Sequence, residues 1–261
     1  MVTFCPIASG SSGNCIFAGT ESTRLLIDAG LSGRTIEKGL AGICDRPIDG
    51  ILLTHEHSDH ISGAGVLARR FHVPVYATKN TWRYLLRHKT IGAVPESQIK
   101  MVEPGQTFSM GDMEITAFDV PHDSSQPVGY CLQSQGYKIT VATDMGCVTD
   151  TIREYIRGSH ILLLESNHDL EMLKNSRYPR QLIERVMSSQ GHLSNVSAGT
   201  LLAETAWEGL QFVFLGHLSE ENNRPLVALD TVRNILESRR VHIKNLTIAD
   251  RYGPGEPVVL R

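Results

Sequence analysis

Residues 50–60 read Gly-Ile-Leu-Leu-Thr-His-Glu-His-Ser-Asp-His, an apolar run that ends in a cluster of ionisable side chains. The apolar run predicts a buried strand over residues 50–54. Helical spacing of apolar residues follows over 60–71, and a further short apolar run over 75–77 predicts a second strand. The order of strand, loop, helix and strand is typical of an α/β layer.

The side chains at the end of this strand form a pattern suited to metal binding. His55 and His57 are two residues apart in extended chain and point to the same side, while Asp59 and His60 lie in the first helical turn. Imidazole and carboxylate ligands suit zinc or manganese, and two ions about 3.5–4 Å apart can hold a hydroxide between them. One segment can therefore serve two metal ions.

Further strands and helices are predicted on both sides of this segment. Apolar and β-rich runs predict strands over 2–7, 15–18, 24–28, 114–119, 130–133, 137–143, 161–165 and 211–215, and helical spacing predicts helices over 148–157, 180–189, 196–208 and 222–238. Two sheets packed together with helices outside would fit this order, and several strand ends would then gather at one edge. No repeat or long linker divides the chain, so we expect one domain over residues 1–261.

Composition excludes several classes of protein. The chain has 261 residues, 41% hydrophobic, and a formal net charge of −3, so it can bury a core and carries no polybasic tail. It lacks a membrane-length apolar stretch and the pattern of a signal peptide. Its five cysteines are widely spaced, without a CxxC pair. We therefore expect a soluble, cytoplasmic protein that does not bind membranes.

The segment His55-Glu56-His57-Ser58-Asp59-His60 resembles the HxHxDH motif of the metallo-β-lactamase superfamily. This resemblance implies an α/β fold, the αββα sandwich of two mixed sheets flanked by helices. It also implies four further site residues, and a matching residue follows an apolar run in each case: Asp28, His122, Asp144 and His217. Any one of them alone would more often be a turn or helix cap, and it is their joint order that favours a metal site.

The same resemblance implies a ligand set for each metal. One metal would take His55, His57 and His122, and the other Asp59, His60 and His217, with Asp144 as the bridge. Asp28 is expected behind the ligands, where a carboxylate orients an imidazole through a hydrogen bond. Glu56 is expected to face solvent or a basic neighbour.

Two motifs in the second half resemble those of the β-CASP nucleases. These are Leu-Leu-Leu-Glu-Ser-Asn over 162–167, and Gly-His-Leu-Ser, which occurs at both 191–194 and 216–219. Glu165 and His192 are only 27 residues apart. We therefore expect a short helical insertion around 166–190 in place of the inserted domain of those nucleases.

The overall pattern most resembles the compact bacterial YycJ/WalJ-like group. The shared segments are Ser-Gly-Ser-Ser-Gly-Asn-Cys over 9–15, the HxHxDH segment, and 216–219 with Asn222-Asn223. This resemblance implies a 5′ to 3′ exonuclease with a nucleic-acid substrate, DNA rather than RNA. The oligomeric state is left open.

The expected catalytic residues are Asp59, His192 and Glu165. His192 has no place in either metal shell, yet it lies in a copy of the segment that contains the ligand His217. We expect it to protonate the leaving sugar oxygen, with Glu165 holding the ring in the productive tautomer. The alternatives for His192 are a helix-capping or buried structural histidine. Those for Glu165 are a carboxylate that supports a metal ligand and one that caps a strand end.

The expected substrate-binding residues lie in loops. Ser11, Ser12 and Asn14 could cradle a terminal phosphate, although a plain hairpin turn explains this composition equally well. Loops after His122 and His217 add the candidates Ser124, Ser125, Asn222 and Asn223. On a helix, Lys79, Arg83 and Arg87 would form one basic stripe able to contact phosphates, or one that is merely solvated.

Three functions compete. The leading hypothesis is a two-metal phosphodiesterase acting on nucleic acid through a metal-bridging hydroxide. A glyoxalase-like thioesterase or lactonase would have the same fold, but Glu165 and His192 would have no catalytic role in it. A non-catalytic nucleotide or phosphate sensor would use the same metal pocket without turnover.

Overall fold

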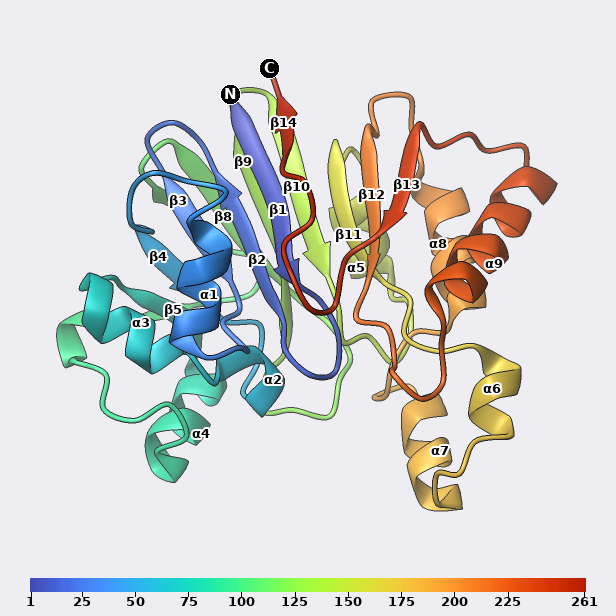
Figure 1. Cartoon of the computed structure of the whole chain (residues 1–261), viewed down its shortest axis with the longest axis horizontal. Coiled ribbons are helices and arrows are strands. Elements are labelled where there is room, and N and C mark those ends of the chain that lie inside the picture. The colour runs from blue at the N-terminus through green and yellow to red at the C-terminus, as the bar shows by residue number, and fades with distance from the viewer.

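Two seven-stranded sheets pack face to face, and helices cover the outer face of each (Figure 1). The computed structural model describes residues 1–261. The order of layers is helix, sheet, sheet, helix, which confirms the predicted αββα sandwich.

The first sheet contains, in spatial order, β14 (Val258–Leu260), β1 (Val2–Ala8), β2 (Cys15–Gly19), β3 (Arg24–Ile27), β4 (Gly50–Leu52), β5 (Val75–Thr78) and β6 (Ile99–Val102). The second contains β13 (Asn245–Ile248), β12 (Phe212–Gly216), β11 (Ile161–Glu165), β10 (Tyr137–Ala142), β9 (Val128–Ser134), β8 (Met113–Asp119) and β7 (Thr107–Met110). The helices are α1 (Gly33–Leu40), α2 (Ser58–Ile61), α3 (Ala64–Phe71), α4 (Lys79–His88), α5 (Asp150–Ile156), α6 (Leu170–Lys174), α7 (Arg180–Met187), α8 (Asn195–Thr205) and α9 (Pro225–Ser238), with a 3₁₀ turn at Glu96–Gln98.

Parallel pairing brings the functional segments to one edge of the sandwich. Strands β3 to β6 are parallel to one another, and so are β10 to β13. The carboxyl ends of parallel strands meet at the same edge of a sheet. Five residues that follow or end strands mark this edge, which we call the rim: Asp28, His55, Asp144, Glu165 and His217.

The core has three apolar clusters that match the layers. One lies between the sheets and includes Phe4, Leu163 and Tyr130, whose hydroxyl donates to the carbonyl of Leu53. A second joins the first sheet to α1, α3 and α4, and a third joins the second sheet to α5, α8 and α9. Both faces of the central strands are therefore buried, which explains why β3, β4 and β11 read as continuous apolar runs.

The segment after the HxHxDH motif differs from the single helix predicted over 60–71. It forms two helices, α2 and α3, with a break at Ser62 and Gly63. The N–H of Gly63 donates to the carbonyl of Ala29, and a Cβ at Gly63 would lie 2.3 Å from the carbonyl oxygen of Leu31. This tertiary contact ends α2 early.

The segment 166–190 contains α6 and α7 and adds no strand to the sheet. Asp169 caps α6 by accepting the N–H groups of Glu171 and Met172. No residue of α7 is buried. The pair of helices lies at the lower right in Figure 1, beside the rim.

None of the helices combines the length and apolar character needed to span a bilayer.

We predict that Gly30→Ala will destabilise the fold by more than about 2 kcal/mol, because overpacking against backbone cannot be relieved by a side-chain rotation. A Cβ at Gly30 would lie 1.6 Å from the carbonyl oxygen of Asp59, which also accepts the N–H of Asn14. Urea denaturation measures the change. The control is Gly42→Ala, whose new Cβ comes no closer than 4.0 Å to another atom, and equal stability of the two variants would contradict the prediction.

Candidate metal centre

Three rim residues adopt left-handed backbone conformations. The φ angles of Asp28, Asp144 and His217 are 59°, 58° and 53°. This conformation costs a non-glycine residue on the order of 1–2 kcal/mol, and such strain is concentrated at functional sites. Each of the three turns the chain sharply at the end of its strand.

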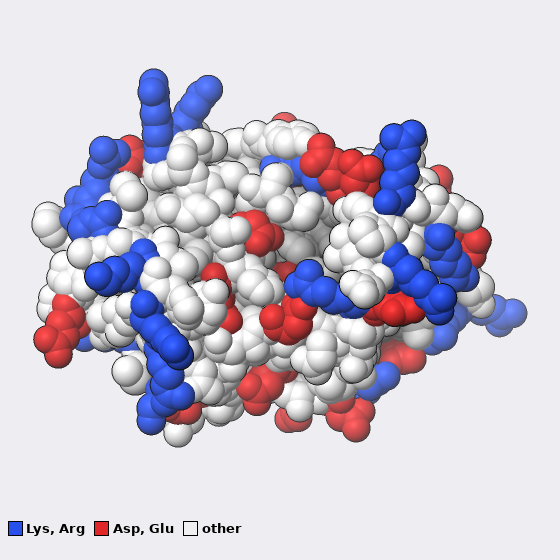
Figure 2. All heavy atoms as spheres, turned by 90° about the horizontal axis from the view of Figure 1, so that it is seen from below, with Lys and Arg blue, Asp and Glu red and all other residues white.

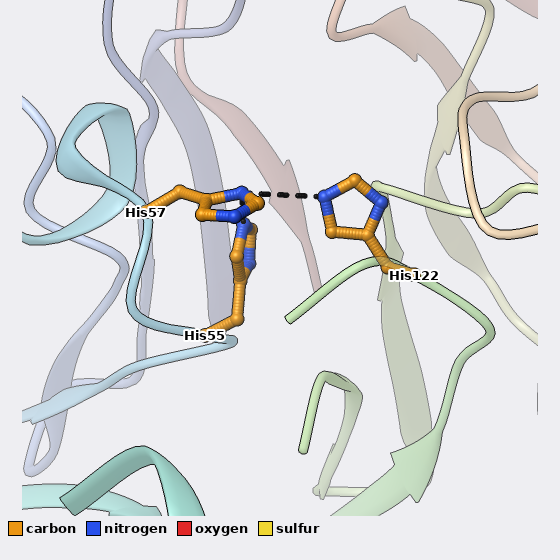
Figure 3. Close-up of side chains that lie close together, drawn as sticks. All are labelled: His55, His57 and His122. Carbon is orange, nitrogen blue, oxygen red and sulfur yellow. Dashed lines mark hydrogen bonds between the residues drawn. The ribbon is translucent and has the colours of Figure 1, made fainter. Parts of the chain in front are cut away.

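Three imidazoles converge to form the first cluster (Figure 3). His57 Nδ1 lies 3.0 Å from His55 Nε2 and 3.3 Å from His122 Nε2. Figure 3 shows His55 and His57 on one loop, facing His122 on a loop from the other sheet. Ligands of a tetrahedral zinc ion at about 2.0–2.1 Å are themselves separated by about 3.3 Å, so this spacing suits such an ion.

A second cluster contains Asp59, His60 and His217. Asp59 Oδ2 lies 3.4 Å from His60 Nε2 and 3.6 Å from His217 Nε2. The carboxylate and one imidazole come from α2, and the other imidazole from the end of β12.

Asp144 lies between the two clusters. Its Oδ2 is 3.4 Å from His60 Nε2, and its Oδ1 is 3.4 Å from His217 Nε2 and 3.8 Å from His122 Nε2. It therefore contacts residues of both clusters.

The far nitrogens of these rings are held by other groups of the chain. Four rings use Nδ1 for this purpose: that of His55 contacts Thr54 Oγ1 at 3.0 Å, that of His60 contacts Asp28 Oδ2 at 2.6 Å, that of His122 contacts the carbonyl of Gly191 at 3.0 Å, and that of His217 contacts Glu165 Oε1 at 3.2 Å. Such contacts fix the tautomer and aim Nε2 at the cluster.

The electrostatics of the centre favour a bound cation. Burial alone would lower the pKa of His217, but Asp144, Asp59 and Glu165 raise it to about 10. Burial and the neighbouring imidazoles lower the pKa of His55, which keeps that ring in the neutral form that binds metals. Two buried atoms, Asp144 Oδ2 and His217 Nε2, have no hydrogen-bond partner. A divalent cation would satisfy both atoms and balance the carboxylates, so the residues fit divalent metal binding.

Glu165 is shared by two histidines. Its Oε1 is 2.7 Å from His192 Nδ1 and 3.2 Å from His217 Nδ1, and its Oε2 accepts the N–H groups of Met145 and Leu193 at 2.6 and 3.3 Å. Although burial would raise the pKa of Glu165, His192 and His217 lower it. The His192 side chain is 20% exposed, and its Nε2 has no partner within the chain.

The loop residues predicted to bind substrate differ in their surroundings. Ser11 and Ser12 are exposed at the tip of the β1–β2 loop. Asn14 is buried, with Nδ2 3.1 Å from His60 Nε2 and 3.0 Å from the carbonyl of Gly10. Its Oδ1 also accepts the N–H of Gly10 at 2.9 Å, so the amide of Asn14 is occupied in closing its own loop.

Of the other predicted loop residues, Asn222 and Asn223 are buried, Ser124 is half-buried and Ser125 is exposed. Asn223 donates to the carbonyls of Ser166 and Asn167 and accepts the N–H of Arg224, so its amide is engaged within the chain. Asn222 is buried with Oδ1 unpartnered, and Ser124 Oγ is likewise buried without a partner.

Glu56 corrects a further expectation. It is 6% exposed, and its Oε1 accepts the N–H and the hydroxyl of Ser125, both at 2.7 Å. It therefore does not face solvent or a basic neighbour. Instead it joins the histidine loop to the loop after His122.

The basic stripe lies on the surface of α4. Lys79, Arg83 and Arg87 are all exposed, whereas Trp82 between them is buried. Seen from the rim, basic side chains gather at the left over α3 and α4 and at the right over α6 and α7, with acidic side chains in the hollowed region between (Figure 2).

Sequence reasoning missed several groups that hold the ligands. Thr54 contacts both His55 and Asp28, and its place directly before the motif is the one signal that could have indicated it. The carbonyl of Gly191 and the N–H of Met145 are backbone groups, so their contacts cannot be recognised from the residue type.

Comparison with known proteins agrees with this geometry. Residues 23–214 match the family model described as "Beta-lactamase superfamily domain". The chain is 39% identical over 238 residues to the exodeoxyribonuclease YycJ of Bacillus anthracis, covering 90% of this chain and 89% of that protein. It is 40% identical over 232 residues to the exodeoxyribonuclease WalJ of Streptococcus pneumoniae, covering 88% and 86% respectively.

Solved structures of low sequence identity share the fold. The metallo-beta-lactamase fold protein YhfI of Bacillus subtilis superimposes with a TM-score of 0.71 at 16% identity, covering 98% of this chain and 100% of that one. Zn²⁺-bound PqqB of Methylobacterium extorquens gives a TM-score of 0.71 at 18% identity, with 100% of both chains covered. The chain therefore belongs to the beta-lactamase superfamily of metal-dependent hydrolases, and within it to the family that includes YycJ and WalJ.

Proposed function

We propose that this protein is a DNA exonuclease that works in the 5′ to 3′ direction with two divalent metal ions, zinc or manganese. The observation that carries the proposal is the position of His192: it lies beside the metal clusters, outside both, and keeps Nε2 free. The names of the relatives YycJ and WalJ, both exodeoxyribonucleases, support a DNA substrate.

In this proposal, one metal ion is held by His55, His57 and His122, and the other by Asp59, His60 and His217, with Asp144 shared. Divalent ions at these positions would supply the Lewis acidity that activates water and neutralises phosphate charge. Asp28 and Glu165 keep the rings of His60 and His217 aimed at the centre, since each accepts a hydrogen bond from the far nitrogen.

His192 is the proposed general acid. The sugar oxygen that leaves a phosphodiester is strongly basic and needs a proton, whereas a thiolate leaving group is stable at neutral pH. Because Glu165 holds Nδ1 of His192 at 2.7 Å, the proton to be given away lies on Nε2, the nitrogen without a partner. A glyoxalase-like thioesterase would gain little from this arrangement.

The proposed path of the strand crosses the basic surface of α4. Lys79, Arg83 and Arg87 would contact backbone phosphates there. The exposed Ser11 and Ser12, in the loop whose Asn14 lies 3.1 Å from His60, are candidates for the terminal phosphate. Such phosphate contacts hold the strand without reading its sequence.

We predict that the protein binds two equivalents of divalent metal per chain and that Asp144→Ala binds at most one. The reason is that Asp144 contacts residues of both clusters. Its loss removes a ligand that both ions would share, so the more weakly bound ion is lost first. Elemental analysis of dialysed protein measures the stoichiometry. Asp150→Ala, which removes an exposed carboxylate from α5, is the control, and an unchanged metal content in Asp144→Ala would contradict the assignment.

We predict that His192→Ala lowers kcat on DNA by about 10²- to 10⁴-fold, the usual contribution of a positioned general acid, while metal content stays at the wild-type level. Steady-state kinetics and elemental analysis of the same preparation give both readouts. The exposed His242, substituted by alanine, serves as control. A variant that loses metal together with activity would show that His192 acts as a ligand.

We predict that substituting Lys79, Arg83 and Arg87 together by alanine weakens DNA binding and reduces the slope of log Kobs against log salt by about 2 to 3, because each lost phosphate contact removes counterion release. Fluorescence anisotropy over a salt series measures the slope. The matched control replaces Arg233, Arg240 and Lys244, which are exposed near the start of β13, at the edge opposite the rim. An unchanged slope would show that these side chains of α4 do not contact the DNA.

One assay separates the competing functions. Metal-loaded protein is incubated with end-labelled DNA and RNA, each with and without a 5′ phosphate, and in parallel with a thioester. The proposal expects shortening of DNA from the 5′ end. If only the thioester is hydrolysed, the protein is a thioesterase and the nuclease assignment is wrong.

A further inference from the structure

A cavity of about 430 Å³ opens beside the metal centre and has no part in the mechanism described above. It forms where three connections meet: the one after β12, the one between β13 and β14, and the end of β1. Figure 1 shows the β13–β14 connection descending to the lower end of β1, next to the connection from β12 to α9. The volume falls within the range of small-molecule pockets.

The cavity is coupled directly to a metal-cluster residue. Ser9, which lines it, accepts the N–H of His217 on its hydroxyl oxygen at 2.9 Å. Leu218, the next residue along the chain, lines the cavity and pairs with Gly10 of the β1–β2 loop. The cavity therefore adjoins the backbone that carries His217, and we take a group bound there to be part of the same substrate.

The lining has the chemistry of a site for a flat heterocycle. Leu218, Pro225 and Ile248 provide apolar surface. At the edge, Tyr252 is 74% exposed, and the guanidinium carbon of Arg251 lies 5.8 Å from the centroid of its ring. Exposed aromatic rings and guanidinium planes are the surfaces on which single-stranded bases stack.

Tyr252 is held in place although it is exposed. Its N–H donates to Asp250 Oδ1 at 2.9 Å, and its hydroxyl donates to Glu220 Oε1 at 3.1 Å. Arg251 donates to the carbonyl of Leu218 at 2.6 Å, which ties the tyrosine loop to the residue after His217. A ring fixed in this way loses little further freedom on binding a base.

Two arginines and two carboxylates line the cavity, and Arg251 pairs with Glu220 at 3.3 Å, so Arg224 is the lining cation with donors to spare. Arg224 uses Nη1 for the carbonyls of Glu220 and Asn223 at 2.9 and 2.7 Å, and its other guanidinium N–H groups have no partner in the chain. These free donors lie at the border of the cavity and suit a phosphate of the same strand. An acyl chain, by contrast, would make no use of these donors.

We propose that this cavity binds a nucleobase next to the scissile phosphodiester, stacked on Tyr252 and Arg251, with Arg224 on an adjoining phosphate. This inference rests on the proposed nuclease function and adds a subsite to it. The subsite would bind the base by its flat face, so it would accept all four bases.

The test compares intact single-stranded DNA with DNA that carries one abasic residue at either the first or the second position from the 5′ end. For the wild-type protein, we expect kcat/KM to fall roughly 5- to 100-fold at one of these positions, as stacking of one base implies. Tyr252→Ala should lose this preference for the intact strand, and Tyr252→Phe should keep it. Leu226→Ala, an exposed neighbour at 71% that does not line the cavity, should also keep it.

Three other outcomes would each contradict one part of the proposal. Equal discrimination against abasic DNA by wild type and Tyr252→Ala, with both proteins folded by circular dichroism, would place the base elsewhere. If the wild-type kcat/KM is the same for intact DNA and for DNA with an abasic residue at either position, the subsite does not exist, while the nuclease function still stands. Failure to cleave any oligonucleotide, with bis(4-nitrophenyl) phosphate or a thioester still hydrolysed, would overturn the proposed function and this inference with it.

Discussion

The structure depends on the burial of Asp144 among imidazoles. Its carboxylate is 2% exposed and lies within 3.4 Å of the rings of both His60 and His217, and one of its oxygens has no hydrogen-bond partner. A buried carboxylate in this state is unfavourable unless positive charge is brought to it. Without metal, the protonated rings of His60 and His217, whose pKa values the surrounding carboxylates raise, supply that charge, and divalent cations would supply it when bound.

The rest of the fold stabilises the strained backbone of this arrangement. Three residues of the rim have left-handed backbones, and Gly30 must lack a side chain so that the β1–β2 loop and α2 can approach. The two packed sheets and their three apolar clusters hold these positions rigidly, since strands buried on both faces cannot shift their register without exposing apolar surface. Local strain at functional positions, supported by a regular framework, is the general pattern of enzyme sites.

The fold by itself does not select a reaction. YhfI and PqqB share this architecture at 16% and 18% identity, and the metal ligands alone are compatible with several kinds of hydrolysis. What distinguishes this chain lies around the ligands. Glu165 serves His192 and His217 at once, so the group proposed to move a proton and a group proposed to hold a metal are oriented by a single carboxylate oxygen. This sharing would couple the position of the acid to that of the metal centre.

The sequence by itself determined the alternation of elements, the sandwich, and the residue types that gather at the strand ends. Strands such as β3 and β11 are buried on both faces, so they are visible as apolar runs, and the HxHxDH segment is local, so its spacing is readable. The short strands β6, β7, β13 and β14 were not predicted, because much of each faces solvent and their pairing comes from distant segments. Tertiary structure alone decided that the amides of Asn14 and Asn223 bond to buried partners, that Glu56 turns inward to Ser125, and that Arg251 donates to the carbonyl of Leu218, the residue after His217. Periodicity reports which face of an element is buried, whereas the partner that covers that face is chosen by contacts between residues far apart in the chain.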